Sequence, residues 1–154
     1  MKYSFKQIPI IEYLDETRKT DISLLPSEPL QRFQARSLSE IINAGIQPLQ
    51  NLSVLKIVGA EKRDDWLKNF LTKGLSAFED TLKQTSGKYC VGDNISIADL
   101  CLVPQYEAAI RFKIDVTRFN LINKINSELS KLPEYKISHP FSQPDCPLEL
   151  KFKI

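Results

Sequence analysis

The sequence has few of the residues from which metal and nucleophile sites are built. Its 154 residues include three cysteines (Cys90, Cys101 and Cys146) and one histidine, His139. No CxxC or HxxxH pair accompanies them, so no common metal-ligand spacing is present. A Ser/His/Asp or Cys/His mechanism would have to use His139, which lies in a proline-rich tail. We therefore expect reduced thiols in a cytoplasmic protein, with neither a bound metal nor a catalytic histidine.

Long apolar runs and an excess of one charge are also lacking. No run approaches the roughly 18 residues of a membrane span, and residues 1–5 lack the apolar core of a signal peptide. Twenty-one Lys and Arg face nineteen Asp and Glu, a formal net charge of +2. No long basic run or basic-aromatic repeat is available to follow a phosphate backbone. We expect neither a membrane nor a nucleic acid as partner.

The composition and periodicity instead predict one all-α domain. Hydrophobic residues make up 42% of the chain and charged residues 26%, with 5 Gly and 9 Pro, as in ordinary globular domains. Apolar residues recur at helical spacing, and strict alternation is almost absent. The predicted helices are a short one with Pro9 in its first turn, one from Pro29 to Val58 kinked between Gly45 and Pro48, and others over 62–84 and 119–132. The helix over 62–84 carries two apolar columns, which are Trp66, Phe70, Gly74, Phe78 and Leu82 at spacings of four, beside Leu67, Leu71 and Leu75. The tail after Pro133 is expected to be extended or partly disordered.

A loop over residues 85–94 leads to the sharpest local signal in the chain. Ser96 and Asp99 have the spacing of a shortened capping box, and Ile95 and Leu100 have that of a hydrophobic staple. These residues predict where the next helix begins. Its predicted stripe, with a kink at Pro104, consists of Ile97, Cys101, Pro104, Ala108 and Arg111.

Several blocks of sequence together resemble the maleylacetoacetate isomerase family, which is the zeta class of glutathione transferases. The blocks are Ala44–Leu55 (AGIQPLQNLSVL), Tyr89–Asp93 (YCVGD), Ala98–Gln105 (ADLCLVPQ), Arg111–Asp115 (RFKID) and Ser138–Pro140 (SHP). Their common order, over roughly residues 10–148, is far more specific than any one motif.

The resemblance implies a glutathione-transferase C-terminal helical bundle, with most of a thioredoxin-like N-terminal domain missing. Residues 1–20 resemble the last helix of that domain and a linker, and residues 21–154 resemble the helical domain. The family's catalytic Ser-Ser-Cys stretch has no counterpart here, so no catalytic residue is assigned. The family's Gln-Ser dipeptide would fall on Lys6 and Gln7, where the hydroxyl is lost. We therefore expect a fragment, an alternative product or a truncated gene product.

The resemblance also implies two sets of binding residues. Glutathione would lie beside Gln47, Asn51, Leu52 and Ser53, and Arg111 would bind a carboxylate of a small dicarboxylic acid. Local chemistry offers other interpretations. Gln47 could be a solvated polar residue at a kink, Asn51 and Ser53 could satisfy backbone groups, and Arg111 could simply complement a helix C-terminus.

The implied activity is glutathione-dependent cis-trans isomerisation of maleylacetoacetate to fumarylacetoacetate, a step of phenylalanine and tyrosine catabolism. Glutathione transferase activity accompanies it in the family, whose full-length members are homodimers. The isolated chain, which lacks the catalytic half, is expected to be inactive. The alternative is a non-catalytic glutathione-transferase-like module that binds other proteins.

Overall fold

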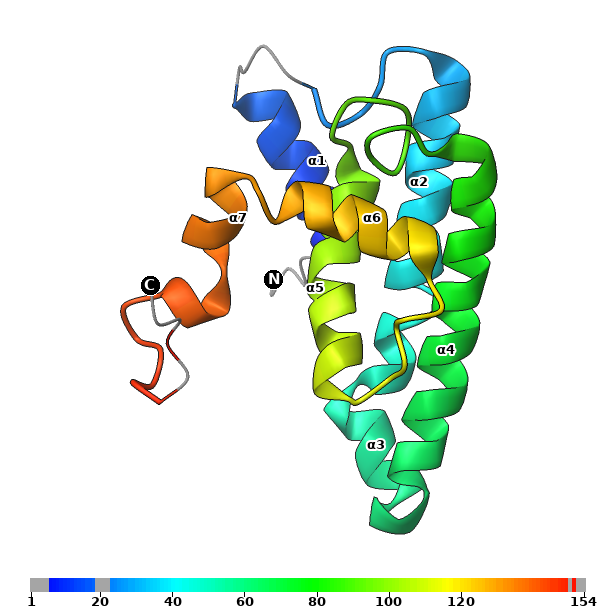
Figure 1. Ribbon diagram of the computed structural model, residues 1–154, viewed down its shortest axis with the longest axis vertical. Helices are drawn as coiled ribbons and strands as arrows, with labels where there is room; N and C mark the ends of the chain where they lie inside the picture. The colour runs from blue at the N-terminus through cyan, green and yellow to red at the C-terminus, as the bar shows by residue number, and fades with distance from the viewer. Residues whose placement is uncertain (1–5, 19–22, 150, 152–154) are drawn as a thin grey trace, which may run out of the picture.

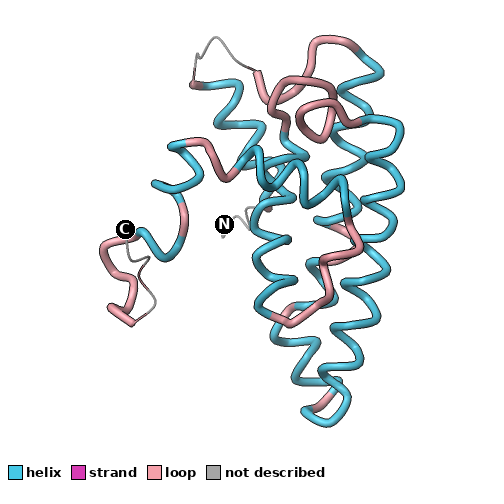
Figure 2. The backbone as a smooth tube through the Cα atoms, in the orientation of Figure 1, coloured by secondary structure: helices cyan, strands magenta, loops and turns pink. Residues whose placement is uncertain are grey.

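The computed structural model describes residues 6–18, 23–149 and 151, and its regular structure is helical (Figures 1 and 2). Within these residues the only β-type pairing is in two isolated bridges, Ser86 with Gly92 and Val91 with Asn94. The all-α prediction is confirmed. The helices are α1 (Gln7–Thr17), α2 (Pro29–Asn43), η1 (Gln47–Gln50), α3 (Leu52–Val58), α4 (Ala60–Thr85), α5 (Ile97–Arg111), α6 (Asn120–Leu129), α7 (Pro133–Ser138) and η2 (Pro140–Ser142). Across the described part of the chain, no helix combines the length and apolarity that crossing a membrane requires.

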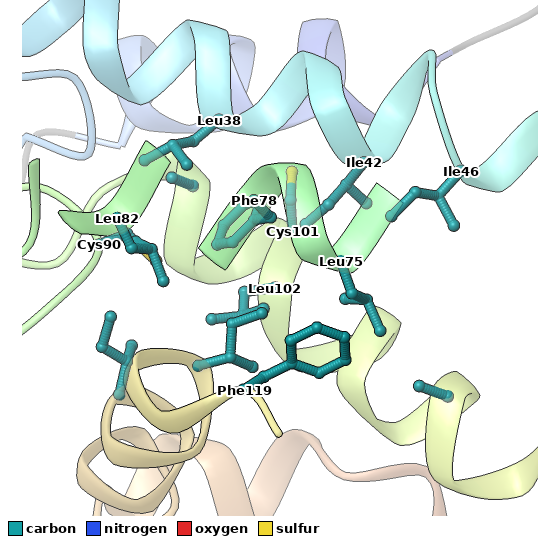
Figure 3. Packing of buried hydrophobic residues seen from close by; sticks show 14 of the residues in the cluster. Leu38, Ile42, Ile46, Leu75, Phe78, Leu82, Cys90, Cys101, Leu102 and Phe119 are labelled. Atoms are coloured by element: carbon teal, nitrogen blue, oxygen red, sulfur yellow. The ribbon is translucent and has the colours of Figure 1, made fainter. Parts of the chain in front are cut away.

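Helices α2, α4 and α5 form the centre of the bundle and extend along its long axis (Figure 1). Figure 3 shows side chains of all three meeting in one core, with Leu38 from α2, Phe78 from α4 and Leu102 from α5 fully buried. The predicted apolar columns of α4 are confirmed. The buried residues of α4 are Leu67, Leu71, Leu75, Phe78 and Leu82.

Gly74 lets the segment after α2 approach α4 closely. A Cβ at this position would lie 2.4 Å from Cγ1 and 2.7 Å from Cδ1 of Ile46, which is fully buried. The missing side chain therefore provides the space that Ile46 fills.

The single kinked helix predicted from Pro29 to Val58 is wrong, because the chain breaks it into three pieces. Helix α2 ends at Asn43, the 3-10 helix η1 follows, and Asn51 begins α3. Pro48 cannot donate a backbone hydrogen bond to a preceding turn, and Asn51 has extended dihedral angles and caps a new helix. The chain therefore changes direction here instead of bending within one helix.

The buried carboxylate of Asp99 joins the loop before α5 to the first turn of that helix. Its Oδ1 accepts the Cys90 N–H at 2.9 Å, and its Oδ2 accepts the Ser96 N–H at 2.9 Å and the Ser96 hydroxyl at 3.0 Å. Burial raises the pKa of the Asp99 carboxyl, and the hydrogen bonds from Cys90 and Ser96 oppose that shift. The predicted start of the helix is confirmed.

The predicted stripe on α5 is correct only in part. Ile97, Cys101 and Ala108 are buried, whereas Pro104 and Arg111 are exposed. The helix continues through Pro104 to Arg111. The spacings along the stripe alternate between four and three. Since a helix has 3.6 residues per turn, both residues that follow a spacing of three, Pro104 and Arg111, are displaced to the same edge of the stripe, and this edge faces solvent.

Helix α6 crosses the bundle and is held at its start by a side chain of α4 (Figure 1). The Glu79 carboxylate accepts the N–H groups of Leu121 at 2.8 Å and Ile122 at 2.9 Å. A carboxylate at this position satisfies first-turn donors and complements the helix dipole. The helix is shorter than the predicted 119–132.

The prediction of an extended or partly disordered tail is wrong for residues 133–142. Pro133 begins α7 and Pro140 begins η2. Proline suits the first position of a helix, where its missing N–H would have no helical partner. The same residues that suggested irregular structure therefore initiate two short helices.

We expect Asp99→Ala to lower the free energy of unfolding by on the order of 3 kcal/mol, because it leaves two buried N–H groups without their acceptor. Ser96→Ala removes only the hydroxyl bond and should cost about 1 kcal/mol. Urea unfolding followed by circular dichroism measures both. An Asp99→Ala midpoint equal to that of the unmutated chain would contradict this role.

We expect Gly74→Ala to destabilise the fold by about 1–2 kcal/mol, since overpacking at Ile46 exceeds the gain in helix propensity. Thermal unfolding of Gly74→Ala, Ile46→Ala and the double variant tests the contact. The double variant should lose less stability than the sum of the single losses. Additive losses would show that the two residues are not coupled.

Candidate functional site

The short helix η1 is anchored to the long helix α4. The indole Nε1 of Trp66 donates to the Leu49 carbonyl at 2.9 Å, and Leu49 N–H closes the 3-10 turn on Ile46. Trp66 is partly buried. This bond holds the segment that carries the predicted glutathione-side residues.

A reciprocal amide pair joins η1 to α5. Gln50 Nε2 donates to Gln105 Oε1 at 3.2 Å, and Gln105 Nε2 donates to Gln50 Oε1 at 3.1 Å. Gln105 is 1% exposed, so both halves of its amide need partners inside the protein. The pair fixes the position of η1 along the helix that ends at Arg111.

Gln47 connects η1 to α1. Its Nε2 donates to Gln7 Oε1 at 2.9 Å, and both side chains are partly buried. Gln47 is therefore only partly solvated, and its amide has a partner within the protein. Whether it also contacts glutathione remains a prediction.

Asn51 and Ser53 form the N-terminal cap of α3. Asn51 Oδ1 accepts the Ser53 N–H at 3.0 Å and the Ser53 hydroxyl at 2.8 Å. The local interpretation is confirmed for Asn51, which satisfies a backbone N–H, whereas the Ser53 hydroxyl bonds to the Asn51 side chain and not to a backbone group. Both remain exposed, and Leu52 between them is 77% exposed. The amide Nδ2 of Asn51 takes no part in the cap bonds and is the group of this side chain that could donate to a ligand.

Arg111 is the last residue of α5 and is exposed to solvent. Its guanidinium lies over the Phe112 ring, 5.4 Å from the centroid. Ion pairs within the described residues join Arg36 to Glu12, Lys83 to Asp80 and Lys131 to Glu128, and Arg111 takes part in none of these. Its place at a helix C-terminus is favourable for a cation, and its exposure is compatible with anion binding.

A contact between α7 and α5 was not predicted from the sequence. The hydroxyl of Tyr135 donates to Glu107 Oε1 at 2.8 Å. Burial, followed by this hydrogen bond, raises the pKa of the Tyr135 phenol. The two residues are 28 positions apart, and Tyr135 lies in the tail for which no helix was expected. Helical periodicity therefore could not have paired them.

The cysteines and the histidine belong to the packing of the protein. All three cysteines are free, as expected. Burial raises the pKa of the Cys90 thiol well above its usual value and that of Cys101 to about 11, so both thiols are protonated and poor nucleophiles at neutral pH. His139 is buried, and its Nδ1 accepts the Phe141 N–H at 3.1 Å. Among the described residues, no group of three His, Cys, Asp or Glu side chains could hold a metal ion.

An apolar hollow lies on the outer face of α2, and none of the predicted binding residues lines it. It is lined by Pro29, Arg32, Phe33, Arg36, Ser37 and Glu40. The predicted residues lie instead on η1, at the start of α3 and at the end of α5, and we call these segments together the η1–α5 junction. Gln47, Asn51, Leu52 and Ser53 are adjacent in the chain, and the Gln50–Gln105 pair connects their segment to the helix of Arg111.

Comparisons with known proteins test the family resemblance. Residues 54–136 match the family described as "Glutathione S-transferase, C-terminal domain". The chain is 49% identical over 146 residues to maleylacetoacetate isomerase of Mus musculus, covering 95% of this chain and 67% of the mouse protein. It is 44% identical over 146 residues to probable maleylacetoacetate isomerase 1 of Drosophila melanogaster, covering 95% of this chain and 59% of the fly protein. The chain thus spans about two thirds of the length of such relatives.

A solved structure of maleylacetoacetate isomerase from Anaeromyxobacter dehalogenans 2CP-1 has the same fold over most of this chain. Its TM-score is 0.86 at 32% identity, covering 92% of this chain and 65% of the bacterial one, and it holds dicarboxyethyl glutathione and citrate in the active site. The helical architecture, the matched family domain and the identity to curated relatives agree with one another. The chain belongs to the maleylacetoacetate isomerase family, the zeta class of the glutathione transferases.

Proposed function

We propose that this chain supplies the substrate-facing helical part of a glutathione-dependent isomerase that converts maleylacetoacetate to fumarylacetoacetate. The observation that carries the proposal is the exposed Arg111, outside the ion pairs of the described chain, on the helix that Gln105 ties to η1. The sequence identity to maleylacetoacetate isomerases supports it.

The residues of the η1–α5 junction fit glutathione chemically. Glutathione presents amide groups and carboxylates, and the Gln47 and Asn51 amides can donate to such acceptors. Bound glutathione would supply a thiol whose thiolate adds reversibly to the conjugated double bond, allowing rotation before the bond is restored. Gln47 and Asn51 would hold its backbone, and the exposed Leu52 would contact its apolar parts.

Arg111 would hold and orient the dicarboxylic acid. Its planar guanidinium can pair with a carboxylate through two parallel hydrogen bonds, which fixes direction as well as position. Such a pair would restrain the substrate while the carbon–carbon bond that thiolate addition has made single rotates, before expulsion of the thiolate restores the double bond. The citrate and dicarboxyethyl glutathione held by the bacterial relative are polycarboxylates, as this role requires.

Residues 1–20 would form the last helix of a thioredoxin-like domain and a linker, with residues 21–154 as the helical domain. Helix α1 leaves Ile10, Tyr13 and Leu14 exposed by 41%, 66% and 36%, at spacings of three and four. These residues form an apolar face that the rest of the thioredoxin-like domain would cover.

A second candidate function is a non-catalytic module that binds other proteins. The observation in its favour is the outer face of α2, where Leu30 is 60% exposed and Phe33 is 65% exposed beside the apolar hollow. The homodimerisation expected of full-length members would use such apolar surface as well. A module of this kind would bind its partners whether or not Arg111 is present.

We expect Arg111→Ala to weaken binding of dicarboxyethyl glutathione by roughly 10- to 100-fold, the loss of a charged hydrogen bond. Binding of glutathione itself should change by less than about twofold, because glutathione does not use Arg111 in this proposal. Isothermal calorimetry on the 154-residue chain measures both.

Lys113→Asn is the matched control. It removes the same charge two residues away and suits the left-handed backbone at Lys113, whose φ is 57°. It should leave both affinities nearly unchanged. Equal losses in the two variants would reveal a general charge effect, and failure of the unmutated chain to bind either compound would refute the proposed role.

A further inference from the structure

Glu107 lies one helical turn before Arg111 on α5. Residues four apart share a helix face, and a glutamate placed four positions before a cation has the favourable orientation for an ion pair. Glu107 is half-buried and Arg111 is exposed, so the two positions lie at the border between the buried and the exposed faces of α5. Glu107 is therefore a competitor, inside the protein, for any carboxylate that approaches the Arg111 guanidinium.

In the structure each of these two side chains has another partner. Tyr135 of α7 donates its hydroxyl to Glu107 Oε1 at 2.8 Å, and the Arg111 guanidinium lies over Phe112. Over the described ranges, no ion pair within 4.0 Å includes Arg111 or Glu107. A hydrogen bond from a hydroxyl to a carboxylate is charge-assisted and stronger than a neutral one. Half-burial protects it from water, whereas an exposed Glu–Arg pair is screened.

We propose that Tyr135 is a positioning residue that holds Glu107 away from Arg111 and so keeps the guanidinium available to a substrate carboxylate. This inference rests on the proposed function of Arg111. It makes the docking of α7 on α5 a determinant of anion affinity, although Tyr135 touches neither glutathione nor substrate in this scheme.

The Tyr135 ring also packs within the C-terminal segment. It lies 5.9 Å from the His139 ring, and His139 lies 5.1 Å from the Phe141 ring, measured between centroids. These ring contacts join α7 to η2. A Phe at position 135 would retain the ring packing and lose only the hydroxyl.

Tyr135→Phe should release Glu107 to pair with Arg111 and weaken binding of dicarboxyethyl glutathione by about two- to fivefold, the usual worth of an exposed pair. Adding Glu107→Gln should restore the affinity, because an amide competes poorly for a guanidinium. Loss of α7 packing alone would not be repaired by Glu107→Gln. Calorimetry on the 154-residue chain measures the binding of each variant.

Glu134→Gln, combined with Tyr135→Phe, is the matched control for charge. Glu134 is exposed in the first turn of α7, and its substitution removes the same negative charge without changing the turn that precedes Arg111. This combination should not restore the affinity. Restoration by Glu134→Gln, or unchanged affinity in Tyr135→Phe, would overturn the inference.

A measurement without ligand separates this inference from the proposed function. The NMR signal of the Arg111 Nε–H should shift in Tyr135→Phe as the ion pair forms and return in Tyr135→Phe/Glu107→Gln. An unmoved signal overturns the exchange of partners, whatever the titrations show. An unmutated chain that fails to bind dicarboxyethyl glutathione overturns the proposed function, and the NMR signal still decides whether Tyr135 controls the partner of Glu107.

Discussion

The buried carboxylate of Asp99 is the interaction on which the rest of the structure depends. It accepts hydrogen bonds from the Cys90 N–H in the loop before α5 and from the Ser96 N–H at the start of α5. The same side chain therefore closes the loop and caps the helix. The Ile97 N–H adds a bond to the Leu24 carbonyl from the segment before α2. Because the first turn of α5 is fixed in this way, the direction of the whole helix is fixed with it.

Helix α5 in turn positions the residues that contact η1 and α7. Gln105 meets Gln50 of η1, Glu107 meets Tyr135 of α7, and Arg111 ends the helix in solvent. These residues lie at successive positions along the same helix. Side chains on a helix are positioned more accurately than side chains on a loop. In our proposal, binding at this site depends on the placement of α5 between η1 and α7.

Local rules predicted the parts of the fold that depend on neighbours in sequence. The apolar columns of α4 and the Ser96–Asp99 start of α5 follow from spacing alone and are confirmed. The break of the helix after Asn43 was predicted only as a kink, because Pro48 by itself is compatible with a kink. The anchoring of Leu49 by Trp66 and of Gln50 by Gln105 decides the outcome, and both contacts join residues far apart in the chain.

The site could be predicted from the sequence to a similar extent. Resemblance pointed to Gln47, Asn51 and Arg111, and the structure assigns Asn51 a capping bond that local chemistry also predicted. The partner of Gln47 on α1 and the Tyr135–Glu107 bond were not predictable from spacing, since tertiary packing brings these residues together. Helix α7 was not predicted, because Pro133 was expected to end the preceding helix, although proline equally suits the first position of a new one.

We propose that the η1–α5 junction is the ligand-binding part of this chain. Chemical-shift mapping of its backbone amides by NMR during a titration with dicarboxyethyl glutathione tests this proposal. We expect saturable shifts at residues 47–53 and at the end of α5, with the outer face of α2 unaffected. Shifts confined to α2, or none at saturating concentration, would contradict the account.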